Sequence, residues 1–133
     1  MEKMRILIVE DVSIIMAVNK RLIQKLGFEA DCASTAEEAL KLFDKKSYHL
    51  VITDLGLPKM QGEELIAKIR KYESRFRPFE SRIYALTAYD IHDVKKGCIA
   101  AGANNVFNKP LTIDLISKII RECAIHFTND ITV

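Results

Sequence analysis

The stretch HLVITDLGLP, from His49 to Pro58, decides the fold class and raises the main question about this chain. Its apolar part, Leu50 to Thr53, predicts a buried β-strand. The strand ends on Asp54, and Gly56 with the proline two residues later marks a loop. A carboxylate at the mouth of an apolar strand costs free energy unless another group pairs with it. Asp54 therefore needs a partner, which the rest of the chain has to supply.

Short apolar runs alternate with helical patterns along the chain. The other predicted strands are Arg5 to Val9, Ala30 to Ala33, Ile83 to Thr87 and Val106 to Phe107. Apolar residues recur at helical spacing in the sets Val18, Leu22 and Leu26; Ala39, Leu40 and Phe43; Ile66, Ile69 and Tyr72; Ile91, Val94, Cys98 and Ala101; and Ile116, Ile119, Ile120 and Cys123. This order predicts an α/β fold, a doubly wound five-stranded parallel sheet covered by five helices.

Local signals place several element ends. Gly27 and Gly102 follow the first and fourth helical patterns, where a left-handed cap is expected. Thr35 with Glu38 resembles a capping box before the second helix. The polar segment Tyr72 to Arg82 predicts an exposed loop before the fourth strand.

The composition is that of an ordinary globular domain. The chain has 133 residues, 49% hydrophobic and 29% charged, and its 20 basic and 18 acidic residues leave a net charge of +2. This balance is typical of neither a disordered nor a membrane-spanning chain, and the dispersed basic residues form no nucleic-acid footprint. We expect one domain over residues 1–133, with a core over 5–126, a frayed tail over 127–133, and no direct binding of nucleic acid.

The cysteines and the N-terminus bear on location. Cys32, Cys98 and Cys123 stand far apart and in no metal-binding spacing, so we expect small buried apolar side chains in a reducing compartment. The N-terminal apolar run, Ile6 to Val9, is too short for a signal peptide or a membrane span. The expected location is the cytoplasm, without membrane insertion of this domain.

Polar residues follow four of the predicted strands. Glu10 and Asp11 follow the first, Asp54 ends the third, Thr87 ends the fourth and Lys109 follows the fifth. Singly, each has an ordinary role as a cap, a turn residue, a strand residue or a solvated charge. Together they gather at the carboxyl ends of parallel strands, where such sheets bind ligands. Packing alone does not require this placement, which therefore favours a functional site.

The chemistry of these groups points to a metal. Carboxylates in contact repel, by ~4 kcal/mol at ~4 Å and an effective dielectric of about 20, so a cation must help to hold them. Because the candidate ligands are oxygens, with room left for water and phosphate, Mg²⁺ fits better than Ca²⁺. Mg²⁺ beside a free carboxylate and a lysine suggests phosphoryl chemistry, in which Asp54 attacks phosphorus while Lys109 and Thr87 contact the phosphoryl oxygens.

Four motifs, ILIVED, VITDLGLPKMQG, ALTA and AGANNVFNKP, resemble in kind and order those of the response-regulator receiver domain of two-component signalling, which has a flavodoxin-like fold. The resemblance spans Arg5 to His126. It implies that Asp54 is the phosphoacceptor, that Asp11, Asp54 and the Gly56 carbonyl bind Mg²⁺, and that Glu10 binds it through water.

The same resemblance assigns roles near the last two strands. Thr87 and Lys109 would report and stabilise phosphorylation, and the Lys109–Pro110 peptide bond is expected to be cis. The domain would then be a signalling domain that assists its own phosphorylation and dephosphorylation, not an enzyme in its own right.

The segments VEDVSIIMAVNKRLIQKLG and KGCIAAGANN, and the long loop before RIYALTA, also resemble the receivers of hybrid sensor kinases. This implies a phosphorelay with a sensor histidine kinase or a histidine phosphotransfer domain, with the chain in the cytoplasmic portion of a membrane-anchored hybrid kinase. Ile14, Ile15 and Met16 are consecutive, so they cannot all face the core. Ile14 and Ile15 are a candidate docking patch, although a single exposed apolar residue is also common.

Some positions depart from the pattern of many receivers. Val106 stands where many carry an aromatic switch residue, with Phe107 beside it on the opposite strand face. Gly56 has no side chain to guide a hydrolytic water, whereas Tyr89, just beyond Ala88, could cover the phosphoryl group. We expect Val106, Ala88 and Tyr89 to modulate the site, and Tyr89 to slow phosphoryl loss by excluding water.

Other function classes stay open. Aspartyl-phosphate phosphatases of the haloacid dehalogenase type also use an Asp nucleophile with Mg²⁺, but their motif needs an acid at the position of Gly56. A degenerate receiver used as a non-phosphorylated binding scaffold is disfavoured by the complete set of acids, hydroxyl and lysine. A weak homodimer through the fourth and fifth helices is also left open.

Overall fold

The computed structural model describes residues 3–132, with side chains through Thr128. The strands are β1 (Ile6–Val9), β2 (Ala30–Ala33), β3 (Leu50–Asp54), β4 (Arg82–Thr87) and β5 (Asn105–Asn108). The helices are α1 (Ser13–Lys25), α2 (Ala36–Lys45), α3 (Gly62–Phe76), α4 (Ile91–Ala101) and α5 (Ile113–Thr132). All strand pairs are parallel, in the order β2-β1-β3-β4-β5, which confirms the predicted fold class.

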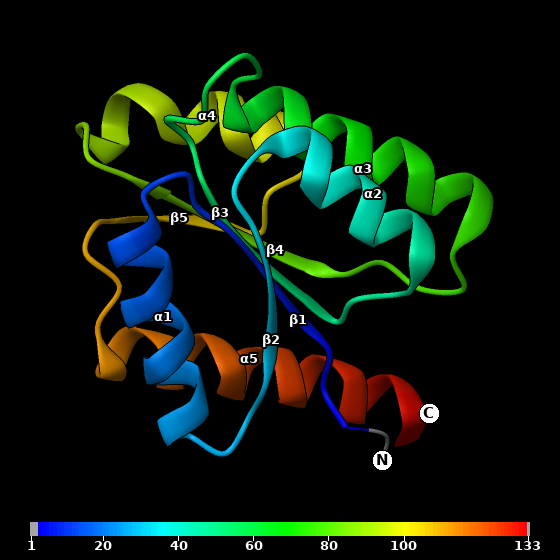
Figure 1. Cartoon of the computed structure of the whole chain (residues 1–133). Helices are drawn as coiled ribbons and strands as arrows, with labels where there is room; N and C mark the ends of the chain where they lie inside the picture. The colour runs from blue at the N-terminus through cyan, green and yellow to red at the C-terminus, as the bar shows by residue number, and fades with distance from the viewer. Residues whose placement is uncertain (1–2, 133) are drawn as a thin grey trace.

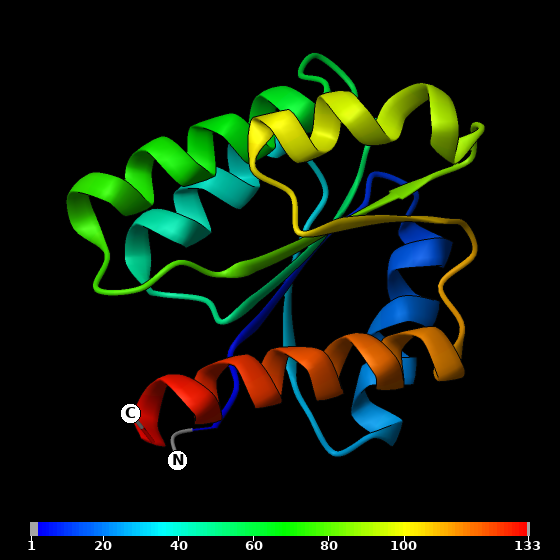
Figure 2. The same cartoon turned by 180° about the vertical axis from the view of Figure 1, so that it is seen from behind.

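Helices cover both faces of the sheet. Helices α2, α3 and α4 lie on one face, and α1 and α5 lie on the other (Figures 1 and 2). In β1, Leu7 faces the core under α2 to α4, whereas Ile6 and Ile8 face the core under α1 and α5. Because the side chains of the inner strands β1 and β3 are buried on both faces of the sheet, these strands are apolar on both faces, which explains their continuous hydrophobic runs.

The apolar helix faces that were predicted to pack on the sheet do so, except in α1. Leu22 and Leu26 are partly buried, but Val18 is 53% exposed, and the buried residues of α1 are Asn19 and Ile23. Positions 18, 22 and 26 drift around the helix by about 40° per step, because four residues exceed one turn of 3.6 residues. Val18 therefore leaves the core face and borders a surface groove.

The predicted exposed loop from Tyr72 to Arg82 is largely wrong. Helix α3 continues through Phe76, and only five residues separate it from β4. Within this segment Glu73 and Ser81 are buried at 3% and 2% exposure. The polar composition misled the prediction, because the Glu73 carboxylate accepts hydrogen bonds from both the amide and the hydroxyl of Ser81 at 2.7 Å and is therefore satisfied inside the fold.

Three helix-end predictions are confirmed with one change. Gly27 and Gly102 have φ angles of 88° and 119°, in the left-handed region that favours glycine. Thr35 Oγ1 accepts from the Glu38 amide at 3.1 Å. The Glu38 carboxylate, however, accepts from the amide and hydroxyl of Ser34 and not from the Thr35 amide.

The C-terminal helix and the cysteines also differ from expectation. Helix α5 continues to Thr132, past residue 127, where a frayed tail was predicted. The Phe127 ring packs against the rings of His49 and Phe79, at 5.0 and 5.3 Å between centroids, so the first residue of the predicted tail is anchored to the fold. Cys98 and Cys123 are buried as predicted, but Cys32 is only partly buried.

Candidate phosphorylation and metal site

The acidic residues meet where the strand order reverses. The chain runs from β1 to β2 on one side and then returns to β3 on the other, so the loops after β1 and β3 diverge. Glu10 and Asp11 follow β1, and Asp54 is the last residue of β3. Each of the three offers a carboxylate oxygen within 4.8 Å of the other two. The predicted acidic cluster is therefore present, with Glu10 and Asp54 buried and Asp11 exposed.

Lys109 supplies the partner that Asp54 requires. Its Nζ lies 2.8 Å from Asp54 Oδ2 and 3.3 Å from Glu10 Oε1. The side chain is 23% exposed, whereas the two carboxylates are 7% and 2% exposed. One ammonium group thus balances part of the charge of two buried acids, and it comes from a loop 55 residues away from Asp54 in the chain.

For both Glu10 and Lys109, burial and the opposite charge nearby shift the pKa in opposite directions. Burial raises the pKa of Glu10, the Asp54 charge adds to that rise, and the hydrogen bond from the Val12 amide and the Lys109 ammonium oppose it. For Lys109, burial would lower the pKa, but the hydrogen bonds and charges of Asp54 and Glu10 together outweigh it and raise the pKa above 10.5. Lys109 therefore stays cationic at neutral pH.

Backbone contacts fix the loop that carries Asp54. The Gly56 amide donates to Asp54 Oδ1 at 3.0 Å, and the Leu55 amide donates to the carbonyl of Leu86 at 3.1 Å. The Gly62 amide donates to the carbonyl of Leu55 at 3.2 Å, and a Cβ on Gly62 would lie 2.7 Å from Leu55 Cα. Only glycine allows this approach, so Gly62 lets α3 begin directly against the residue after Asp54.

Thr87 and Lys109 come together through paired strand ends. Thr87 lies opposite Asn108 in the β4–β5 register, and its carbonyl accepts from the Lys109 amide at 2.8 Å. Thr87 is 1% exposed, and its Oγ1 accepts from the Tyr89 amide at 3.0 Å. The side-chain amide of Asn108 donates to the Tyr89 carbonyl at 2.8 Å. Sequence reasoning passed over Asn108, although a polar side chain beside Lys109 at a strand end was the available signal.

The predicted modulating residues occupy different environments. Val106 is 2% exposed in the core under α2 to α4, and the Phe107 ring stacks on Tyr84 on the opposite face with 6.0 Å between centroids. The predicted opposite facing of these two residues is confirmed. Ala88 is exposed, and the Tyr89 side chain is 72% exposed, so its ring projects into solvent. The Lys109–Pro110 peptide bond is cis, as expected.

Comparison with known proteins identifies the family. Residues 6–121 match the response regulator receiver domain family. The chain belongs to this family. The receiver is therefore a signalling domain of two-component and phosphorelay systems, a class that is generally not enzymatic. The match covers all five strands and the first part of α5.

Relatives of the receiver include hybrid kinases. It is 32% identical over 120 residues to the aerobic respiration control sensor protein ArcB of Escherichia coli, and 29% identical over 120 residues to hybrid signal transduction histidine kinase F of Dictyostelium discoideum. These alignments cover 90% and 89% of this chain but only 15% and 11% of the relatives. The receiver thus corresponds to a small part of each relative.

A solved complex provides a structural neighbour. It is the co-crystal structure of the Saccharomyces cerevisiae histidine phosphotransfer signaling protein Ypd1 with the receiver domain of its downstream response regulator Ssk1. The match has a TM-score of 0.83 and 30% identity, and covers 90% of this chain and 88% of that one.

An apolar groove opens beside the receiver's acidic cluster. It has a volume of about 160 Å³ and lies between α1 and the loop before α5, with Glu10 and Lys109 in its lining. Its apolar lining consists of Ile14, Ile15, Val18, Leu86, Pro110 and Leu111. Ile14 and Ile15 are 75% and 38% exposed, whereas Met16 packs against the core, so the three residues do not all face the core, as predicted.

The donor set suits a hard divalent cation. Asp11 makes no hydrogen bond within the described part of the chain, so its carboxylate is available to a ligand. The three acids offer oxygen donors alone, on one open edge of the sheet, as Mg²⁺ sites with several waters require.

Among the described residues, no helix is both long and apolar enough to cross a bilayer.

Proposed function

We propose that the receiver accepts a phosphoryl group from a phosphohistidine onto Asp54 and then passes it on or signals by a conformational change. The phosphorus–nitrogen bond of the donor breaks, a phosphorus–oxygen bond to Asp54 forms, and the imidazole leaves with the electron pair and takes up a proton. The product is an acyl phosphate at the end of β3.

The position of Lys109 carries this proposal. Its ammonium group is 2.8 Å from the Asp54 carboxylate, where it would contact a phosphoryl oxygen once Asp54 is modified. The buried Thr87 hydroxyl, held on the paired strand end beside it, would hydrogen-bond another oxygen. These two groups would stabilise the negative charge that develops on the transferring group.

Glu10, Asp11, Asp54 and the Gly56 carbonyl are the proposed holders of Mg²⁺, with Glu10 acting through water. Bound there, Mg²⁺ would neutralise phosphoryl charge and orient the transferring group. The fold holds one carboxylate oxygen of each of the three acids within 4.8 Å of the other two despite their repulsion. The Gly56 amide, which donates to Asp54 Oδ1, keeps that carboxylate oriented.

We propose that the groove beside Lys109 receives the phosphohistidine-bearing partner, with Ile14 and Ile15 as docking residues. Exposed apolar side chains within reach of the acceptor suit a helical partner whose apolar face surrounds its histidine. The solved complex of a similar receiver with a histidine phosphotransfer protein supports this class of partner. The similarity to hybrid kinases favours a phosphorelay.

Intact mass spectrometry tests the phosphoacceptor. After incubation with acetyl phosphate and Mg²⁺, the wild-type chain should gain the mass of one phosphoryl group, and neither a chelator-treated sample nor Asp54→Asn should do so. Asp114→Asn, an exposed carboxylate in the first turn of α5, is the matched control and should be modified like the wild type. Equal modification of Asp54→Asn would rule the proposal out.

We further propose that Tyr89 slows loss of the phosphoryl group by covering it and excluding water. Gly56, the residue two positions after Asp54, has no side chain that could guide a hydrolytic water. A Cβ at residue 56 would lie 3.8 Å from Asp54 Oδ1, so this position directly borders the acceptor. The decay of the phosphorylated form should be faster in Tyr89→Ala than in the wild type. An unchanged decay rate would show that Tyr89 has no such role.

A further inference from the structure

The strand pair that carries Thr87 and Lys109 ends in an additional side-chain contact. In a parallel pair the backbone hydrogen bonds stop where one strand leaves the sheet, and here the last one joins the Lys109 amide to the Thr87 carbonyl at 2.8 Å. Asn108 lies directly opposite Thr87, and its side-chain nitrogen donates to the Tyr89 carbonyl at 2.8 Å and lies 3.4 Å from the Thr87 carbonyl. The side-chain amide of Asn108 thus extends the contact between the two strands to Tyr89, two residues beyond the end of β4.

This contact fixes the environment of the Thr87 hydroxyl. Tyr89 is held at its carbonyl by Asn108, and its amide donates to Thr87 Oγ1 at 3.0 Å. Oγ1 acts as an acceptor there, and among the described residues it donates no hydrogen bond, so its proton is available to a ligand. The hydroxyl is therefore ready to donate to a ligand at the acidic cluster.

Val106, also on β5, provides no second side-chain contact of this kind. Its side chain is buried and apolar, so it can form no hydrogen bond to Thr87. Within the described residues, Asn108 is the side chain of β5 that bonds to the Thr87–Tyr89 segment.

We propose that Asn108 is a positioning residue for the phosphorylation reaction, which acts through the Tyr89 backbone to hold the Thr87 hydroxyl toward the phosphoryl group. This inference rests on the proposed function of Asp54. Asn108 does not contact the reacting atoms. It reduces the freedom of the donor group, and such preorganisation speeds a reaction without any new contact to the substrate.

A double-mutant cycle tests the proposal. Asn108→Leu keeps the size of the side chain but removes the donor, and it should slow phosphorylation by acetyl phosphate and Mg²⁺ on the order of three- to tenfold. In a Thr87→Val background the same change should have no further effect, because the hydroxyl it positions is gone. Asn105→Leu, at the other end of β5, is the control and should leave the rate unchanged. A full Asn108→Leu effect in both backgrounds, or none in either, would overturn the inference.

A second readout separates this inference from the proposed function. In the unphosphorylated chain, amide hydrogen exchange at Tyr89 should be several-fold faster in Asn108→Leu than in the wild type, because the Tyr89 carbonyl loses its donor. If no variant takes up a phosphoryl group, the proposed function fails while the exchange result still stands. If phosphorylation occurs but Tyr89 exchange does not change, the role of Asn108 fails alone.

Discussion

The ammonium group of Lys109 lies 2.8 Å from Asp54, and this pair is the electrostatic centre of the site. Glu10 shares the same ammonium at 3.3 Å, so removal of Lys109 leaves two buried carboxylates facing each other. At neutral pH and without Mg²⁺, we expect Lys109→Met to lower the free energy of unfolding by about 2 kcal/mol.

Mg²⁺ should reverse most of this loss, because it replaces the missing positive charge. Urea unfolding with and without Mg²⁺ measures both effects. Lys95→Met, an exposed lysine of α4, should change little under either condition. A Lys109→Met variant as stable as the wild type without Mg²⁺ would contradict the charge-balancing role.

The buried Glu73 should be one of the most sensitive positions away from the site. Its carboxylate is 3% exposed and accepts from Arg70 and from the amide and hydroxyl of Ser81, so it joins α3 to the start of β4. Glu73→Ala leaves those donors unpaired and should cost about 3 kcal/mol of unfolding free energy in chemical denaturation. Glu80→Ala, with an 80% exposed side chain that lies 3.9 Å from the same arginine, should cost less than about 1 kcal/mol.

Two glycines at helix positions should respond in opposite directions to alanine. A Cβ on Gly62 meets the Leu55 backbone at 2.7 Å, so Gly62→Ala should destabilise the fold by about 2 kcal/mol or more and disturb the Asp54 loop. Gly97→Ala has only Glu63 nearby, at 3.7 Å, and lies inside α4, so it should stabilise the fold by about 0.5–1 kcal/mol. Thermal unfolding of both variants provides the comparison, and an equally tolerated Gly62→Ala would contradict the close approach.

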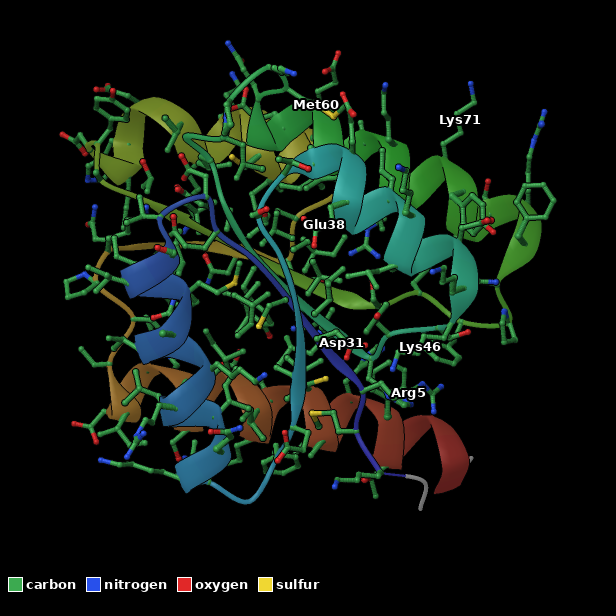
Figure 3. All side chains as sticks on the ribbon, in the orientation of Figure 1. Arg5, Asp31, Glu38, Lys46, Met60 and Lys71 are labelled. Atoms are coloured by element: carbon green, nitrogen blue, oxygen red, sulfur yellow. The ribbon has the colours of Figure 1, made fainter. Side chains whose placement is uncertain are left out.

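Acid should weaken an ion pair on the edge strand β2. Figure 3 shows Asp31 and Lys46 side by side, away from Met60, and the two charged groups are 2.7 Å apart. Burial would raise the pKa of Asp31, but hydrogen bonds from Lys46 and Tyr48, together with the charges of Lys46 and Lys20, outweigh it and lower the pKa below 3.8. The stabilisation is therefore present above pH 3.8 and is lost as the pH falls through the lower folded-state pKa.

Because both side chains are more than a third exposed, at 47% and 38%, the effect should stay below about 1 kcal/mol. Asp31→Asn should be less stable than the wild type at pH 6, and the difference should vanish near pH 2. Urea unfolding at the two pH values measures it. A difference that persists at low pH would mean that the carboxylate charge is not its source.

The apolar groove should matter for transfer from a protein and not from a small molecule. Ile14→Asp replaces the 75% exposed docking side chain with a charged one and leaves Glu10, Asp11 and Asp54 in place. We expect transfer from a phosphorylated histidine phosphotransfer protein that donates to this chain to slow by about tenfold or more, with no change in modification by acetyl phosphate. Phe76→Asp, at an exposed position at the end of α3, is the control for surface charge. A rate loss with both donors would place Ile14 in the chemistry and not in docking.

Much of the fold and the acidic cluster could be predicted from the sequence. The strands around Leu7 and Val51 are continuous apolar runs because both sheet faces are covered, and parallel strands bring their carboxyl ends to one edge. Predictions failed where polar composition was taken as exposure. Glu73 is polar but buried, and the burial of such a residue depends on partners that no local pattern contains.

The sequence by itself determined the alternation of strands and helices and the strand ends on which Glu10, Asp11, Asp54, Thr87 and Lys109 lie, because periodicity and turn residues act within a few positions. Only the tertiary structure decided that one ammonium group serves two buried acids, that Gly62 lies against Leu55 and that Asn108 holds Tyr89. These relations join segments far apart in the chain, and their distances depend on how the helices pack the sheet. Local sequence patterns therefore do not predict such distances.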